Sequence, residues 1–291
     1  MPTALPQLLA CPAPAKLNLF LHITGRRTDG YHLLQSVFQL IDRCDTLDFY
    51  VRDDGEIHRL NQVLGVPEQE DLVIKAARLL QSHTGTQQGA DIRLHKSLPM
   101  GGGLGGGSSD AASTLIALNH LWQCNLNRQA LMQLGLQLGA DVPFFIYGQN
   151  AFVEGIGEQM QAVPTPDQWF IVIEPGVHVP TPTIFSAKEL TRDTKPVRIT
   201  DFSSAARVEW KNDMQAVACA LHPEIAAVIH WLKQFELHEG DAKMTGSGSC
   251  VFCAFPNEEA AKKVLKQVPN HWTSWTTKAL QQHPINLKIN L

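Results

Sequence analysis

No apolar run in this chain of 291 residues approaches the length needed to cross a bilayer. Residues 1–14 also lack the charged-then-apolar order of a secretory signal, so we expect a cytoplasmic protein with no membrane partner. Charge of one sign is not in large excess, because 24 Lys and Arg residues stand against 28 Asp and Glu residues, a net charge of -4. Such a balance does not indicate the excess of basic residues that binds nucleic acid, so we expect no nucleic-acid partner.

Closely spaced cysteines are nearly absent. The chain has 6 cysteines, and only Cys250 and Cys253 lie near each other in the sequence. A structural zinc site needs a second such pair or a pair of histidines nearby. In an extended strand, side chains three residues apart also face opposite sides. We therefore expect buried free thiols and no metal site built from protein ligands.

Glycine, in contrast, is concentrated in one segment. Six glycines and two serines stand between Leu98 and Asp110, directly before apolar residues at helical spacing over 109–122. Because glycine reaches positive φ without steric cost, successive backbone N–H groups can converge there on an anion. The N-terminus of the following helix adds its positive end. The segment therefore predicts a phosphate-binding loop between a strand and a helix.

Three kinds of glycine-rich loop are compared with this segment. A P-loop requires a lysine after its last glycine, whereas Gly107 leads into Ser-Ser-Asp. Gly101, Gly103 and Gly106 match the dinucleotide-binding pattern, but that loop would follow the first strand of the chain and this one lies well downstream. A protein kinase would carry His-Arg-Asp and Asp-Phe-Gly, and neither tripeptide occurs.

Periodicity predicts alternating strands and helices in the first half of the chain and a second set after a proline-rich turn at 164–166. The expected strands are 15–23, 46–51, 91–96 and 169–173, and the expected helices are 71–83, 109–122, 127–138, 213–220 and 224–235. In the first strand, one face is expected to hold Leu17, Leu19, Leu21 and Ile23, and the other Lys16, Asn18 and His22. The turn suggests two domains, 1–163 and 164–291.

Three ordered motifs resemble the GHMP family of small-molecule kinases. They are a lysine-bearing strand at 14–23, the glycine-rich loop at 99–109, and a second small-residue loop, Thr-Gly-Ser-Gly, at 245–248. The resemblance implies an α+β fold of two domains: an N-terminal nucleotide-binding domain with the ribosomal S5-like arrangement, and a C-terminal ferredoxin-like α/β sandwich. It also implies an active site in the cleft between them and a kinase that uses ATP and Mg²⁺.

Further motifs narrow the resemblance to one branch of the family. The Tyr31-His32 pair is the most discriminating, and the segments 139–143, 154–158 and 180–182 extend the match over nearly the whole length. The resemblance implies phosphorylation of the 2-hydroxyl of 4-diphosphocytidyl-2-C-methyl-D-erythritol, in non-mevalonate isoprenoid precursor biosynthesis. Two alternatives remain open: a kinase for another small alcohol, and a catalytically silent sugar or nucleotide sensor. A sensor has no need of both Lys16 and Asp141.

The resemblance also assigns roles to residues. Asp141 would accept the proton of the acceptor hydroxyl, and Lys16 would hold that aspartate ionised. Tyr31 and Phe185 would stack on the cytosine, while His32 would bind the edge of the base. The nucleotide-binding residues would be Lys96, Pro99, Met100, Gly101, Gly102, Gly103, Leu104, Gly105, Gly106, Gly107, Ser108 and Ser109. Besides the aromatic residues and His32, the acceptor-binding residues would be Asn18, Thr181, Pro182, Thr245, Gly246, Ser247 and Gly248.

Two further expectations concern the adenine pocket and assembly. Asp71 stands where relatives often carry Asn, so the resemblance assigns it no adenine contact. The expected partner is a small-molecule substrate, and the chain is expected to be a monomer or a weak homodimer.

Overall fold

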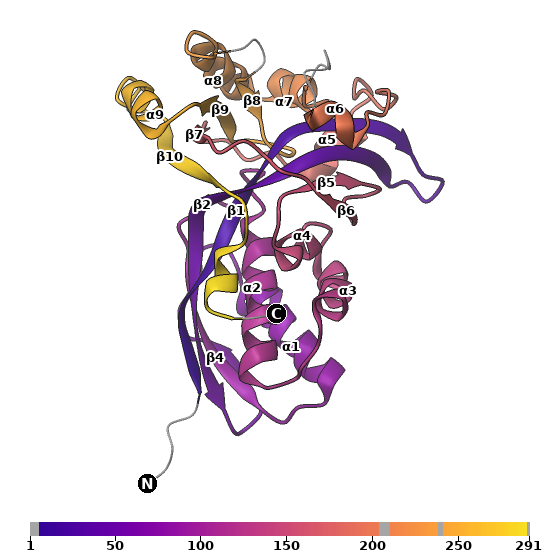
Figure 1. Cartoon of the computed structure of the whole chain (residues 1–291), viewed down its shortest axis with the longest axis vertical. Coiled ribbons are helices and arrows are strands. Elements are labelled where there is room, and N and C mark those ends of the chain that lie inside the picture. Colours follow the sequence, from indigo (N-terminus) through magenta and orange to yellow (C-terminus); the bar gives the residue numbers. More distant parts are fainter. Residues whose placement is uncertain (1–5, 204–209, 238–240, 290–291) are drawn as a thin grey trace.

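The computed structural model describes residues 6–203, 210–237 and 241–289, which form two lobes connected by long strands (Figure 1). The strands are β1 (Gln7–Arg26), β2 (His32–Arg52), β3 (Ile57–Arg59), β4 (Gly89–His95), β5 (Ala151–Glu154), β6 (Gln159–Ala162), β7 (Trp169–Glu174), β8 (Lys243–Met244), β9 (Val251–Phe255) and β10 (Thr273–Leu280). The helices are α1 (Leu72–Thr84), α2 (Gly106–Leu121), α3 (Arg128–Leu138), α4 (Val142–Tyr147), α5 (Thr181–Ser186), α6 (Ile199–Ser203), α7 (Gln215–Leu221), α8 (Pro223–Lys233) and α9 (Glu258–Leu265), with 3-10 turns η1 (Glu68–Glu70) and η2 (Pro284–Leu287). None of these helices is long and apolar enough to span a membrane.

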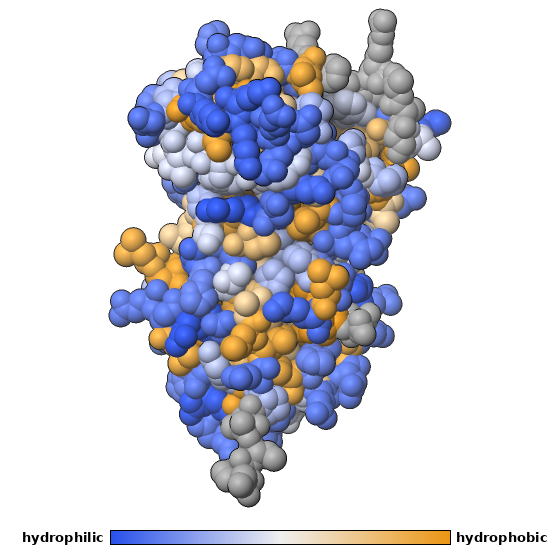
Figure 2. Space-filling view, turned by 60° about the vertical axis from the view of Figure 1, so that its left-hand side comes forward, coloured by the Kyte–Doolittle hydropathy of each residue, from blue (hydrophilic) through white to orange (hydrophobic). Residues whose placement is uncertain are grey.

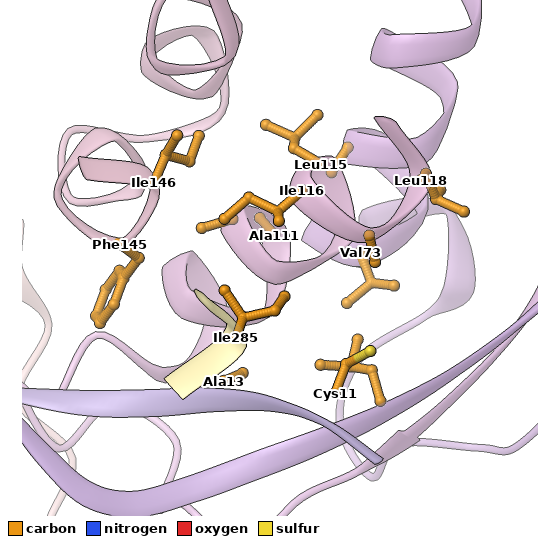
Figure 3. Close-up of a cluster of buried hydrophobic side chains, with 14 of the residues drawn as sticks. Cys11, Ala13, Val73, Ala111, Leu115, Ile116, Leu118, Phe145, Ile146 and Ile285 are labelled. Carbon is orange, nitrogen blue, oxygen red and sulfur yellow. The ribbon is translucent and has the colours of Figure 1, made fainter. Parts of the chain in front are cut away.

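In the lower lobe, helices α1 to α4 pack beside the strands β1, β2 and β4 (Figure 1). Helix α2 lies at the centre of the core. Its residues Ala111, Leu115 and Ile116 contact side chains from β1, α1, α4 and η2, as the close-up shows (Figure 3). Most of α2 is buried, including polar residues such as Ser113 and Thr114. The glycine-rich loop is therefore anchored to a largely buried helix of this lobe.

One sheet extends through both lobes. Its strand order is β3-β4-β2-β10-β7-β9-β8, and β2 also pairs with β1 and β5. Strand β10 joins the two parts of this sheet, because Ala279 pairs with Ile41 of β2 while Thr273 pairs with Glu174 of β7. The backbone hydrogen bonds of this strand fix the two lobes relative to each other.

The upper lobe packs α7, α8 and α9 against β7, β8 and β9 (Figure 1). Hydrophilic residues cover much of the upper lobe in the face that Figure 2 shows, and apolar residues are more frequent on the lower lobe. Each core takes residues from the distant end of the chain. Leu21 and Ile23 of β1 belong to the upper core, and Ile285 and Ile289 belong to the lower core. The division into 1–163 and 164–291 stays a prediction from the sequence.

The structure corrects three expectations about these elements. The face assignment in β1 is wrong beyond Asn18, because a bulge between Asn18 and Leu21 shifts the register and brings Leu21 to the cavity that Lys16 lines. Helix α2 begins at Gly106, three residues before the expected start of 109–122, because glycines can occupy its first turn. Strand β2 is far longer than the expected 46–51.

Candidate active site

A cavity of about 600 Å³ opens where the two lobes meet. Its walls come from β1, the glycine-rich loop, the start of α2, the segment before α4, and the two loops at 178–182 and 246–248. The lining includes the following residues proposed from the sequence: Lys16, Asn18, Gly101, Gly103, Gly105, Ser108, Asp141, Thr181, Pro182, Phe185, Gly246, Ser247 and Gly248. The fold therefore brings together side chains from all three motifs that the sequence singled out.

The glycine-rich loop docks directly onto the second small-residue loop. Gly103 has φ +75°, and a Cβ there would lie only 2.2 Å from the carbonyl oxygen of Thr245. The backbone N–H of Cys250 also donates to the oxygen of Gly102 at 3.2 Å. Only glycine allows this close approach of two backbones at a left-handed position. The two loops consequently form one wall of the cavity, with the N-terminus of α2 facing it.

Lys16 and Asp141 meet inside this cavity. Lys16 Nζ lies 3.6 Å from Asp141 Oδ2 and donates to Asn18 Oδ1 at 2.5 Å. The ammonium also lies 4.8 Å from the centre of the Phe38 ring. The Lys16 side chain is 4% exposed and that of Asp141 is 33% exposed, so the carboxylate is the member of the pair that solvent or a ligand can reach.

Asn18 is held in place by partners on both sides. Its Nδ2 donates to Ser36 Oγ at 3.0 Å, and Ser36 Oγ in turn donates to the carbonyl oxygen of Phe20. Its backbone N–H donates to Thr245 Oγ1 at 3.0 Å. These bonds point Asn18 Oδ1 toward Lys16. Ser36 was missed by the sequence analysis, because the part of β2 that carries it was not predicted as a strand.

A second cavity, of about 610 Å³, contains the aromatic residues. It shares Leu34, Ala140, Ile156, Thr181, Pro182 and Phe185 with the first cavity, so the two adjoin each other. Tyr31 lines it and is 60% exposed. His32 stacks on Phe185, with ring centres 4.7 Å apart and planes inclined by 21°. Tyr31 and Phe185 were expected to stack on the cytosine. The structure adds a third ring to this pair, because His32 covers one face of Phe185.

The imidazole of His32 is also bound by an arginine that the sequence analysis missed. Arg192 Nε donates to His32 Nε2 at 3.1 Å. Burial, followed by the nearby charges of Arg192 and Arg26, lowers the pKa of His32 below its ordinary value. His32 is consequently neutral near pH 7. No motif marked Arg192, because its role depends on a contact between segments that are distant in the sequence.

Several proposed nucleotide-binding residues lie beside or beneath the cavity rather than in its lining. They are Lys96, Pro99, Met100, Gly102, Leu104, Gly106, Gly107 and Ser109, and the acceptor residue Thr245 is likewise outside the lining. Lys96 Nζ pairs with Asp110 Oδ2 at 2.8 Å and with Asp45, just below the loop. Asp71 pairs with Arg59 and caps α1 by accepting from the N–H of Val73. Lys96 is therefore bound at the start of α2, and Asp71 is bound by Arg59 and by the N-terminus of α1.

The loop region fits a bound polyphosphate. Gly101, Gly103 and Gly105 all have positive φ, and a Cβ on any of them would lie within 3 Å of a neighbouring atom. The hydroxyl of Ser109 is buried and has no hydrogen-bond partner in the described part of the chain, while Ser108 faces the cavity. No group of three His, Cys, Asp or Glu residues suitable for a metal occurs among the described residues. A magnesium ion here would depend on phosphate oxygens, water and a serine hydroxyl.

Comparison with known proteins places this arrangement in a family. The GHMP kinases N terminal domain matches residues 71–149, and the GHMP kinases C terminal domain matches residues 194–274. A 4-diphosphocytidyl-2-C-methyl-D-erythritol kinase from Herminiimonas arsenicoxydans is 65% identical over 278 residues, covering 94% of this chain and 96% of that protein. A protein of the same name from Azoarcus sp. (strain BH72) is 59% identical over 278 residues, covering 96% of each chain.

Solved structures agree with the sequence matches. A crystal structure of 4-(cytidine 5'-diphospho)-2C-methyl-D-erythritol kinase has a TM-score of 0.79 and 30% identity, covering 94% of this chain and 99% of that one. A mevalonate kinase has a TM-score of 0.67 and 17% identity, covering 94% and 100%, and shows the shared fold alone. The expected GHMP fold is confirmed. The chain belongs to the GHMP kinase family, in the branch of the 4-diphosphocytidyl-2-C-methyl-D-erythritol kinases.

Proposed function

We propose that this protein transfers the terminal phosphoryl group of ATP to the 2-hydroxyl of 4-diphosphocytidyl-2-C-methyl-D-erythritol, in non-mevalonate isoprenoid precursor biosynthesis. The observation that carries the proposal is that the two cavities adjoin and share six lining residues. One contains an ammonium and a carboxylate beside a phosphate-binding loop, and the other contains Tyr31, His32 and Phe185. An acceptor with a flat base at one end and a hydroxyl at the other would fill both. High identity to relatives of that name supports the same substrate.

The glycine-rich loop would bind the nucleotide. Its backbone N–H groups and the first turn of α2 offer donors and a positive helix end to the phosphates, and Ser108 adds a hydroxyl. Phosphoryl transfer through a loose transition state depends mainly on such positioning and on neutralising charge. We propose Ser108 or Ser109 as the protein contact to Mg²⁺. Magnesium, when bound, would offset the negative charge of the phosphates.

Asp141 and Lys16 would act on the acceptor. A carboxylate is a weak base for an alcohol, so Asp141 would accept the hydroxyl proton late, as the bond to phosphorus forms. Lys16 would hold its positive charge beside Asp141 and stabilise negative charge on the attacking oxygen. Asn18 would orient Lys16 through the bond to its ammonium. In this way the pair would hold the hydroxyl oriented toward the terminal phosphate.

The same proposal includes the division of the chain, its assembly and its location. The functional division of the chain would follow 1–163 and 164–291, since the two family matches fall on either side of that boundary. The protein would act as a monomer or weak homodimer, because one chain supplies every side chain named above. A cytoplasmic location agrees with all six cysteines being free thiols.

The test is a coupled assay of ADP release with three alcohols: the cytidyl substrate, mevalonate and homoserine. We expect kcat/KM for the cytidyl alcohol to exceed the others by at least about a hundredfold, because they lack the base that the second cavity would bind. Turnover should stop when EDTA removes Mg²⁺. Preference for another alcohol would support the alternative kinase, and nucleotide binding without turnover of any alcohol would support the sensor.

A further inference from the structure

Arg192 is fixed by three backbone carbonyl groups in the last turn of α5 and just after it. Its Nη2 donates to the oxygens of Phe185 and Ala187 at 2.9 and 2.7 Å, and its Nη1 donates to the oxygen of Leu190 at 3.0 Å. Carbonyls at the end of a helix carry partial negative charge and favour a cation. The guanidinium is therefore held in one orientation, which directs its Nε–H at the ring of His32.

The contact between Arg192 and His32 determines where the imidazole carries its hydrogen. A guanidinium has only donors and never accepts, so His32 Nε2 must be the acceptor across the 3.1 Å contact. A neutral imidazole has one N–H, and the hydrogen must then reside on Nδ1. Stacking on Phe185 restricts rotation of the ring. Within the described residues, Nδ1 has no hydrogen-bond partner, so its N–H remains free to bind a ligand in the cavity that His32 lines.

We propose that Arg192 is a specificity-determining positioning residue, which holds His32 as the Nδ1–H tautomer so that the cavity selects cytosine over uracil. The proposal rests on the proposed function, in which a cytidyl group occupies this cavity. Cytosine presents acceptors at N3 and O2, whereas uracil has a hydrogen on N3. An Nδ1–H donor matches the N3 acceptor of cytosine and would oppose the N3–H of uracil. With the hydrogen on Nε2 instead, Nδ1 would accept and the preference would reverse.

The tautomer can be observed directly. Nitrogen-15 NMR of the full chain with labelled histidine distinguishes the protonated from the unprotonated ring nitrogen, and His32→Gln identifies the signals of His32 by their loss. We expect protonated Nδ1 and unprotonated Nε2 in the protein before any substrate is added. A hydrogen on Nε2 would overturn the proposal. This readout is independent of catalysis, so it stands even if the cytidyl alcohol proves not to be phosphorylated.

Binding of CDP and UDP tests the consequence for specificity. Titration calorimetry would be performed with the nucleotide site filled by a non-hydrolysable ATP analogue. We expect Arg192→Met to reduce the preference for CDP over UDP by about tenfold, because the imidazole can then donate or accept. Arg192→Lys keeps a cationic donor and should restore part of the preference. An unchanged preference in Arg192→Met would refute the proposal.

Two controls separate this role from a structural one. Arg128→Met removes a comparable arginine, which donates to the oxygens of Ile146 and Tyr147 in the lower lobe, and it should leave the preference unchanged. In a His32→Ala background, Arg192→Met should have no further effect on the ratio of CDP to UDP affinities. An equal loss with and without His32 would show that Arg192 does not act through the imidazole. Should Arg192→Met fail to fold, the NMR result and the CDP and UDP affinities of Arg192→Lys still test the proposal.

Discussion

Lys16 Nζ and Asp141 Oδ2 are 3.6 Å apart, a separation too long for a strong hydrogen bond but short enough for an ion pair. The ammonium makes its close hydrogen bond to Asn18 instead, at 2.5 Å. Asp141 thus keeps its oxygens available for another donor while the positive charge stays near. This arrangement suits a carboxylate that must accept a hydrogen bond, and later the proton, from an alcohol.

Ser36 should support catalysis although it does not line the cavity. Ser36→Ala removes the acceptor of Asn18 Nδ2 and frees the amide that orients Lys16. We expect kcat to fall about three- to tenfold with little change in KM for ATP, since a typical hydrogen bond contributes about 0.5–1.5 kcal/mol net. Ser113→Ala removes a comparable bond to the oxygen of Pro12, away from the cavity, and should leave kcat unchanged. Equal effects of the two substitutions would exclude a role for Ser36.

Tyr31 should contribute to acceptor binding alone. Tyr31→Ala removes a ring that lines the second cavity, so KM for the cytidyl substrate should rise about tenfold, by analogy with stacking on a nucleic acid base. KM for ATP should stay constant. Tyr31→Phe retains the ring and should resemble the wild type. Steady-state kinetics with each substrate varied in turn provides the measurement, and equal weakening for both substrates would contradict the assignment.

Gly103 should be required for nucleotide binding. Gly103→Ala would place a Cβ 2.2 Å from the oxygen of Thr245, which must separate the two loops, and we expect KM for ATP to rise at least about tenfold. Gly85→Ala is the matched control. Gly85 has a similar φ of +69° but open space around it, so that change should cost about 1 kcal/mol of stability and leave ATP binding intact. Normal ATP affinity in Gly103→Ala would show that the loops separate freely.

Asp110 should make the stability of the protein depend on pH. Burial raises the pKa of Asp110 to about 8, with Lys96 opposing the shift and Asp45 adding to it. Unfolded aspartate ionises near pH 3.9, so between about pH 4 and pH 8 the folded state binds more protons than the unfolded state. The free energy of unfolding should therefore decrease as pH rises through that window.

Asp110→Asn should weaken this pH dependence, because its amide does not titrate. Urea unfolding from about pH 5 to pH 9 measures it, with Asp53→Asn, an exposed carboxylate in the turn after β2, as the control. Wild type and Asp53→Asn should lose stability at higher pH more steeply than Asp110→Asn. Identical slopes in all three proteins would mean that Asp110 is ionised throughout the window.

The elements with strong local signals were predictable from the sequence. The alternation in β1, the apolar periodicity of α1 and α3, and the glycine-rich loop before α2 each depend on neighbouring residues. The length of β2 was not predictable, because its first half pairs with several partners and is buried without clean alternation. The bulge after Asn18 was missed for a similar reason, since register is set between strands and not within one.

The candidate site residues also divide into those that a local motif marked and those that only the folded contacts reveal. Lys16, Asp141 and three glycines of the loop, Gly101, Gly103 and Gly105, stood in motifs, and the structure brings them to one cavity. Arg192 and Ser36 act through contacts that exist only after folding, so no local pattern marked them. Lys96 illustrates the opposite case: its motif position indicated the nucleotide, whereas its ammonium contacts the buried side chains of Asp45 and Asp110 under the loop.

Single-turnover phosphoryl transfer by Asp141→Asn tests the central claim most directly, because it measures the chemical step without product release. Asn keeps the shape of the side chain and cannot accept the proton, so transfer from bound ATP to the bound cytidyl alcohol should slow by about a hundredfold or more. Both substrates should bind within a few-fold of their wild-type affinities. Transfer at the wild-type rate would remove Asp141 from the mechanism and contradict the proposed role of its pair with Lys16.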